Sequence, residues 1–195
     1  SDNQPLRGGK STPWEGGIRV PFAAQWPGRI PKGIVYQNPV ISFDIFATIA
    51  AQAKATPNPD RPLDGVNLLP FLTGENPGAP HDAIYLRMFD KGAYVVRNQD
   101  FKLVTDKKDA TPELYNLKQD IGEKTNIAAS SAEKLGALEK LRVQWDAQLV
   151  PPVFEGLKPN PKAKANKTPE DCETEIPAWV AIRLLESAPM SDDSR

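Results

Sequence analysis

Residues 93–104 have the sequence Ala-Tyr-Val-Val-Arg-Asn-Gln-Asp-Phe-Lys-Leu-Val, and this stretch decides the fold of the most regular part of the chain. Two runs rich in β-branched and aromatic residues, 93–97 and 101–104, flank the polar residues 98–100. Apolar runs joined by a short polar loop are typical of antiparallel strand pairs. The stretch therefore predicts a β-hairpin with a three-residue loop.

Further strands and a helix are predicted on both sides of this hairpin. Residues 113–117 and 83–88 have strand-like composition, and they would extend the pair to four antiparallel strands. Ser130 and Glu133 match a capping box. Apolar residues follow at spacings of three and four, namely Leu135, Leu138, Leu141, Trp145 and Leu149. The predicted unit is a small antiparallel sheet covered by one amphipathic helix, an α+β arrangement.

The prolines divide the 195-residue chain into three parts. Twelve of the 20 prolines lie in residues 1–80, one lies in 81–150 and seven lie in 151–195. Proline interrupts helices and central strands, so residues 81–150 are expected to hold most of the regular structure.

Fewer elements are predicted outside this middle part. In the first part we expect a short edge strand within Ile18–Trp26 and a helix over Ser42–Ala53 with Ser42 as its N-cap. The last part has a Pro- and Lys-rich composition that is typical of an extended tail, with a short helix predicted over Trp179–Leu185.

Composition excludes several functional classes. The formal net charge is −1, from 24 Lys and Arg against 25 Asp and Glu, which lacks the basic excess of a nucleic-acid binder. No apolar run approaches the ~20 residues that a membrane-spanning helix needs. The single cysteine, Cys172, excludes an internal disulfide, and the single histidine, His81, excludes a His-rich metal cluster. We therefore expect neither a nucleic-acid partner nor a membrane span.

The segment Arg7-Gly8-Gly9-Lys10 is a candidate anion site. Its glycines let the backbone approach a ligand closely and Lys10 supplies a compact positive charge, which suits a tetrahedral oxyanion. The alternative is a flexible surface turn with a solvated lysine. Asp2 and Asn3 offer oxygen ligands for a hard cation such as calcium, but the same pair also describes an ordinary solvated chain end.

Residues 5–22 resemble the signature of the sulfatase family. They have the sequence Pro-Leu-Arg-Gly-Gly-Lys-Ser-Thr-Pro-Trp-Glu-Gly-Gly-Ile-Arg-Val-Pro-Phe. Further similar segments follow in the family's order, at residues 26–31, 44–48, 64–74, 96–103 and 113–117. Residues 5–150 thus resemble the C-terminal portion of a sulfatase of the alkaline phosphatase superfamily.

The resemblance implies a fold. Sulfatases have a large α/β domain followed by a small four-stranded antiparallel sheet packed on a C-terminal helix. By this resemblance, residues 1–80 are the C-terminal end of the catalytic α/β domain. Residues 81–150 are the small C-terminal subdomain, and residues 151–195 are an extension.

The resemblance also implies an activity and its cofactors. Sulfatases hydrolyse sulfate monoesters, such as aryl or carbohydrate sulfates, with a formylglycine nucleophile and calcium or a similar divalent ion. The formylglycine is made from a Cys or Ser in a C/S-x-P-x-R motif, which this sequence does not contain. We therefore expect the chain to be a C-terminal fragment that is inactive alone and that needs the N-terminal remainder of the enzyme.

The resemblance assigns roles to three N-terminal residues. Lys10 matches the family lysine that contacts the substrate sulfate, where a cation stabilises charge that builds up during ester cleavage. Asp2 and Asn3 are candidate metal ligands, because the family places an S-D-N-G ligand motif upstream of the lysine segment. Only Gln4 separates them from Pro5, and this short spacing favours ligands further upstream. Two oxygen ligands do not fill a calcium shell of six to eight.

Arg7, Trp14 and His81 are further candidates for the substrate pocket. Each also has a structural alternative. Arg7 can serve as an ion-pair anchor and Trp14 as a core residue rather than a sugar platform. His81 can be a hydrogen-bonded loop histidine, which we favour because no group of partner residues surrounds it in the sequence.

Three alternative functions remain open. The chain could belong to a phosphodiester or phosphonate monoester hydrolase of the same superfamily, because related scaffolds serve different esters. It could be a non-catalytic module that binds a glycan or a partner, or a purely structural domain. The family is commonly exported in bacteria, so the resemblance implies a periplasmic or secreted protein. No oligomeric state is predicted.

Overall fold

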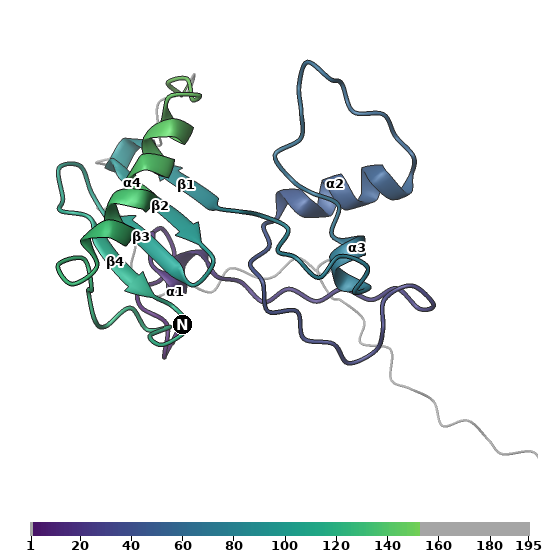
Figure 1. The fold of residues 1–195 in the computed structure, drawn as a ribbon, viewed down its shortest axis with the longest axis horizontal. Helices are drawn as coiled ribbons and strands as arrows, with labels where there is room; N and C mark the ends of the chain where they lie inside the picture. The colour runs from purple at the N-terminus through teal and green to yellow at the C-terminus, as the bar shows by residue number, and fades with distance from the viewer. Residues whose placement is uncertain (1, 153–195) are drawn as a thin grey trace, which may run out of the picture. The chain divides into compact units, whose positions relative to one another are not determined.

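A computed structural model describes residues 2–152 of the chain. The regular elements are α1 (Glu15–Ile18), α2 (Phe43–Gln52), α3 (Leu69–Leu72), β1 (Ile84–Met88), a 3-10 turn (Phe89–Lys91), β2 (Ala93–Asn98), β3 (Phe101–Thr105), β4 (Glu113–Asn116) and α4 (Ala132–Asp146) (Figure 1). The predicted tail and its helix over Trp179–Leu185 lie outside the described residues, apart from 151 and 152. No helix of the described part is long and apolar enough to cross a membrane.

The four strands form one antiparallel sheet in the order β1-β2-β3-β4. This confirms the predicted four-stranded sheet with its C-terminal helix. The hairpin loop is one residue shorter than predicted, because Asn98 pairs with Phe101 and only Gln99 and Asp100 connect the strands. Gln99 has a φ of 54°, a left-handed conformation that is common in two-residue hairpin loops.

Both faces of the sheet are covered, because successive strand residues point to opposite sides. One face packs against the N-terminal segment in a cluster of Trp14, Val95, Val104, Tyr115 and Leu117. The other face packs against α4, which lies across β2 and β3, in a cluster of Val96, Leu103, Leu114 and Leu138 (Figure 1). Burial on both sides explains the nearly continuous apolar runs of β2 and β3.

Helix α4 confirms the predicted helix and four residues of its apolar stripe, Leu135, Leu138, Leu141 and Trp145, but not the predicted capping box. Its N-cap is Ser131, and no side chain caps the helix. The Ser130 hydroxyl instead donates to the Ile127 carbonyl at 3.1 Å. The helix ends at Asp146, so Leu149 of the predicted stripe lies beyond it.

The strand predicted within Ile18–Trp26 is wrong in this structure. Helix α1 ends at Ile18, and residues 19–26 have no regular structure. Pro21 has no N–H to donate, and the side chains of Val20 and Phe22 are 76% and 50% exposed. Within residues 2–152 no neighbouring strand pairs with this segment.

Helix α2 confirms the helix predicted over Ser42–Ala53. Ser42 stands at the N-cap position, but its side chain makes no capping bond. The first turn is held by Asp44, whose carboxylate accepts the N–H groups of Ile41 at 2.8 Å and Val66 at 2.9 Å.

Candidate functional site

The candidate site is built on the N-terminal segment, in which residues 8–12 form what we call the Lys10 loop. Thr12 closes this loop, since its hydroxyl donates to the Gly9 carbonyl at 2.7 Å and its N–H donates to the same oxygen at 3.1 Å. Lys91 Nζ donates to the Ser11 carbonyl at 2.5 Å. Lys10 itself is exposed and makes no hydrogen bond or ion pair with any residue in 2–152. Its amino group is free to meet an anion.

Two glycines let the Lys10 loop pack directly on α1. The Gly16 N–H donates to the Arg7 carbonyl at 2.8 Å. A Cβ added at Gly16 would lie 2.4 Å from the Gly8 carbonyl oxygen, and one at Gly17 would lie 2.3 Å from that of Thr12. Real Cβ atoms do not approach oxygen so closely, so only glycine fits at these positions.

The Asn3 side chain joins the Lys10 loop to α1 by two hydrogen bonds. Its side-chain Nδ2 donates to the carbonyls of Gly8 at 3.1 Å and Gly16 at 3.2 Å. Asp2 Oδ1 accepts the N–H of Gln4 at 3.0 Å.

These contacts bear on the metal site that the resemblance implies. Among residues 2–152, no group of three or more His, Cys, Asp or Glu residues could hold a metal ion. Asp2 and Asn3 supply too few oxygen ligands for calcium, and Asp2 Oδ1 already accepts the Gln4 N–H. The described residues therefore do not form a complete metal site. A part for Asp2 and Asn3 in a larger site stays a prediction.

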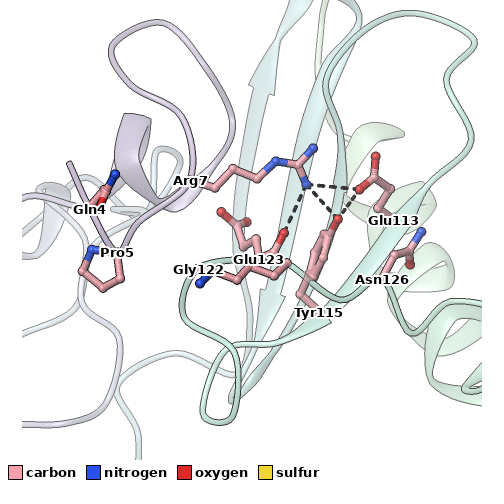
Figure 2. A pocket seen from close by; sticks show the side chains of 9 residues that line it. Gln4, Pro5, Arg7, Glu113, Tyr115, Gly122, Glu123 and Asn126 are labelled. Carbon is pink, nitrogen blue, oxygen red and sulfur yellow. Dashed lines mark hydrogen bonds and ion pairs between the residues drawn. The ribbon is translucent and has the colours of Figure 1, made fainter. Parts of the chain in front are cut away.

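Arg7 anchors the segment to the sheet. Its guanidinium carbon lies 3.4 Å from the centre of the Trp14 ring. Its Nη1 donates to Tyr115 Oη at 2.8 Å (Figure 2). The same nitrogen donates to the Glu123 carbonyl at 3.3 Å and lies 3.4 Å from Glu113 Oε2. Arg7 lines an open hollow, together with Gln4, Pro5, Glu113, Tyr115, Gly122, Glu123, Lys124 and Asn126. Trp14 lies beneath Arg7 in the core, edge-on to Tyr115.

His81 makes its side-chain polar contacts with Asp44 and none with the Lys10 loop. Its Nε2 is 2.9 Å from both carboxylate oxygens of Asp44, and Asp44 is fully buried. This pair joins the segment before β1 to the first turn of α2. The geometry matches the hydrogen-bonded loop histidine that we favoured, and a substrate contact by His81 stays a prediction.

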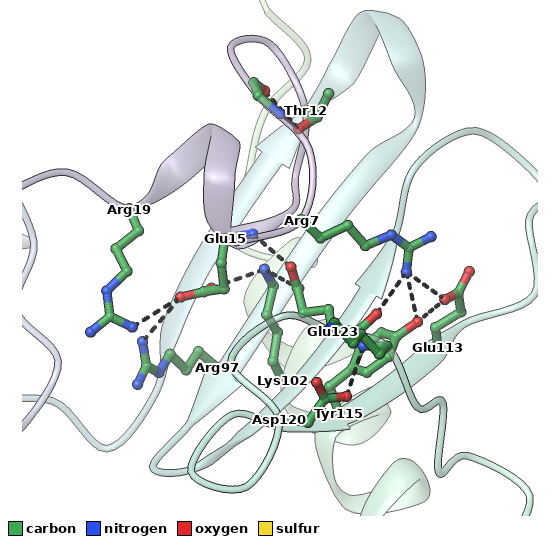
Figure 3. A network of polar contacts seen from close by, with 12 residues as sticks. Arg7, Thr12, Glu15, Arg19, Arg97, Lys102, Glu113, Tyr115, Asp120 and Glu123 are labelled. Atoms are coloured by element: carbon green, nitrogen blue, oxygen red, sulfur yellow. Dashed lines mark hydrogen bonds and ion pairs between the residues drawn. The ribbon is translucent and has the colours of Figure 1, made fainter. Parts of the chain in front are cut away.

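A buried group of charges lies under α1, and sequence reasoning missed it. Lys102 Nζ lies 3.0 Å from Glu15 Oε1 and 2.7 Å from Glu123 Oε1 (Figure 3). The Nη1 atoms of Arg19 and Arg97 lie 3.5 Å and 3.8 Å from Glu15 Oε2. We call these five residues the Lys102 cluster. Lys102, Glu15 and Glu123 are 0%, 1% and 2% exposed.

Burial has the largest effect on the Glu123 carboxyl. It raises the pKa of Glu123 above its ordinary value, although the ammonium of Lys102 acts in the opposite direction. One signal could have predicted the cluster from the sequence. Lys102 stands at an inward position of an apolar strand, where a buried charge requires a partner.

Residues 9–147 match the family model described as N-sulphoglucosamine sulphohydrolase, C-terminal. The chain is similar to arylsulfatase A of Bos taurus, with 30% identity over 175 residues that cover 74% of this chain and 34% of that protein. It is also similar to N-acetylgalactosamine-6-sulfatase of Canis lupus familiaris, with 30% identity over 200 residues that cover 88% of this chain and 38% of that protein.

A shorter match and a solved structure agree with these similarities. Steryl-sulfatase of Rattus norvegicus is 42% identical over 79 residues, which cover 40% of this chain and 14% of that protein. The crystal structure of Ps i-CgsB in complex with k-i-k-neocarrahexaose superimposes with a TM-score of 0.67 at 29% identity. That superposition covers 74% of this chain and 32% of the other. The chain thus spans well under half the length of each of these proteins.

Proposed function

This chain belongs to the sulfatase family, in the C-terminal part of such enzymes, and we propose that it contributes the sulfate-binding Lys10 loop to a longer sulfuric ester hydrolase. The proposal rests on the exposure of Lys10 and on its lack of an ion-pair partner within residues 2–152. Its cation is exposed and unpaired within residues 2–152, on a loop that Asn3, Gly16 and Thr12 hold in place.

Lys10 would act on the sulfate group of the substrate. A compact ammonium next to a sulfate oxygen attracts the bound anion and stabilises negative charge that builds up as the ester bond breaks. A pre-formed loop strengthens this effect, because little chain entropy is lost when the anion binds.

The proposed substrates are sulfate monoesters of aryl compounds or carbohydrates. The similarity to proteins named arylsulfatase A and N-acetylgalactosamine-6-sulfatase supports this class. The similarity to a structure that holds k-i-k-neocarrahexaose supports a carbohydrate substrate.

The longer enzyme would use formylglycine and calcium, or a similar divalent ion, as its family does. The residues in 2–152 do not complete a metal site, and the sequence has no C/S-x-P-x-R motif, so the nucleophile and the metal are assigned to the rest of the longer enzyme. We expect the 195-residue chain alone to be inactive. By its family we also propose that the protein is periplasmic or secreted.

The test of this proposal is a lysine substitution in the longer enzyme. Lys10→Ala is expected to lower kcat/KM for an aryl sulfate by about 100-fold, the usual cost of losing one group that stabilises a developing oxyanion. The matched control is Lys118→Ala, which removes another exposed lysine, just after β4, and is expected to leave kcat/KM unchanged. A Lys10→Ala enzyme that keeps its wild-type kcat/KM would refute the proposal. Faster turnover of a matched phosphodiester or phosphonate monoester would refute the sulfate assignment.

A further inference from the structure

We propose that Lys102 is a positioning residue that sets the Lys10 loop in place for substrate, acting through Glu15 and Glu123. The inference rests on the proposed sulfate-binding role of Lys10. It adds a residue that is fully buried and lies far from that loop in the sequence.

The Lys102 ammonium lies between the sheet and the N-terminal segment. It projects from β3 toward the N-terminal segment and is fully buried between two carboxylates (Figure 3). Glu15 belongs to α1, and Glu123 belongs to the connection between β4 and α4. One cation therefore fastens two separate segments onto the same face of the sheet.

Hydrogen bonds connect the Lys102 cluster directly to the segment that carries the Lys10 loop. Glu123 Oε2 accepts the backbone N–H of Glu15 at 2.7 Å, so the carboxylate also holds the first residue of α1. The next residue, Gly16, donates to the Arg7 carbonyl and accepts from Asn3. Because a Cβ at Gly16 would nearly touch the Gly8 carbonyl, the loop cannot move independently of α1.

The two buried carboxylates of the cluster differ in how many cations surround them. Glu15 has two other cations nearby, Arg19 and Arg97, whereas Lys102 is the one cation that pairs with the Glu123 carboxylate within residues 2–152. Without the ammonium, two buried carboxylates would face each other with less compensation. Like charges in a buried site repel strongly, so α1 would move away from the Glu123 segment and would take the Lys10 loop with it.

A double-mutant cycle in the longer enzyme tests this inference. Lys102→Met keeps an unbranched side chain one heavy atom shorter than lysine and removes its charge. In the wild-type background it is expected to lower kcat/KM by about 10- to 100-fold, as small displacements of binding groups do. In a Lys10→Ala background the same substitution is expected to change kcat/KM less than about twofold, because there is no longer a lysine to misplace.

The matched control is Lys134→Met on the opposite side of the sheet. Lys134 lies on α4, donates to Asn98 Oδ1 at 3.3 Å and stands over the Phe101 ring. The Lys134→Met substitution is expected to leave kcat/KM unchanged in both the wild-type and the Lys10→Ala backgrounds. A residue that only stabilises the fold would lower activity equally in both backgrounds, so equal losses for Lys102→Met would overturn the positioning role.

A second variant keeps the inference testable where Lys102→Met does not fold. Glu123→Gln keeps an oxygen that can accept the Glu15 N–H and removes one charge of the pair. A smaller loss of kcat/KM with the same dependence on Lys10 is expected, and a loss that persists in the Lys10→Ala background would overturn the inference.

Hydrogen exchange on the 195-residue chain gives an independent readout. Amides of residues 7–17 are expected to exchange faster in Glu123→Gln than in Lys134→Met, and equal rates would overturn the inference. The two proposals fail differently. If Lys10→Ala has no effect on kcat/KM, the proposed function falls and takes this inference with it. If Lys10→Ala is impaired and the losses are additive, the positioning role alone falls.

Discussion

At the scale of single residues, the hydroxyl of Tyr115 joins the N-terminal segment to the sheet. It accepts from Arg7 and donates to Glu113. Tyr94 makes a similar contact, donating to Glu139 Oε1 at 2.8 Å. Burial raises the pKa of each tyrosine, and the hydrogen bond to glutamate adds to the effect, so that both reach about 12.

These pKa values predict that the folded state weakens in alkali. An unfolded tyrosine titrates near 10, so the folded state holds these protons more tightly. The resulting stabilisation is fully present below that pH and is lost as pH rises toward about 12. We expect the free energy of unfolding in urea to fall over this range more steeply for the wild-type chain than for a Tyr94→Phe/Tyr115→Phe variant. Two curves of equal slope would contradict the assignment.

Glycine-to-alanine substitutions at Gly16 and Gly136 are expected to change stability in opposite directions. Gly16→Ala would place a Cβ against the Gly8 carbonyl, and we expect it to cost about 1–3 kcal/mol of stability. Gly136 lies inside α4 with nothing within 4 Å of an added Cβ. There the same substitution is expected to stabilise the chain by about 0.5–1 kcal/mol, because alanine loses less entropy in a helix. Urea unfolding measures both, and shifts of the same sign would contradict the packing described for Gly16.

At the scale of elements, α4 contributes to the core through one fully buried side chain. Leu138 is 1% exposed and packs against Val96, Leu103 and Leu114. Farther along, Trp145 stacks on Tyr85 with ring centres 5.1 Å apart, and Arg87 pairs with Asp146 at 2.8 Å. These contacts fasten the helix to β1, β2, β3 and β4 without a capping side chain.

We therefore expect Leu138→Ala to destabilise the fold by about 2–5 kcal/mol, the usual cost of a cavity in a core. Val143 lies on the same helix and is 54% exposed. Val143→Ala is its matched control, and we expect a change within about 0.5 kcal/mol. Chemical denaturation gives both values. A Leu138→Ala chain as stable as the control would show that α4 does not cover the sheet.

At the scale of the whole molecule, α2 carries an unusual amount of exposed apolar surface. Phe43, Phe46 and Ile49 are 62%, 64% and 62% exposed, whereas the helix buries Asp44 and Ala47. Exposed apolar groups of this size are typical of contact surfaces. The chain covers 34% of arylsulfatase A, so we expect other parts of the longer protein to cover α2.

We predict that the 195-residue chain alone self-associates through this helix. Sedimentation is expected to show a mass-average molecular weight that rises with concentration. A Phe43→Gln/Phe46→Gln variant should reduce that rise, because it removes the two exposed aromatic rings. Val143→Gln is the control for a single exposed apolar side chain on α4. Equal association of all three chains would contradict a role for α2.

The sequence by itself determined the elements that depend on neighbouring residues. Two runs rich in β-branched and aromatic residues, joined by a short polar loop, predicted the hairpin of β2 and β3, and the spacing of apolar residues predicted α2 and α4. The resemblance at residues 5–22 identified the family, and it singled out Lys10 and Arg7 as candidates for the site. These signals are local, since each depends on residues that are adjacent or one helical turn apart.

The tertiary structure alone decided what joins these elements. Ser130 was predicted to cap α4 but binds Ile127, because the path of the preceding loop sets where the helix starts. The Lys102 cluster brings together residues 15, 19, 97, 102 and 123. Among these positions, only Glu15 and Arg19 are related by a local pattern, a spacing of four residues. The five charges meet because the N-terminal segment folds onto a sheet that begins more than 60 residues later in the chain, and a buried charge is stable only where that fold supplies its partner.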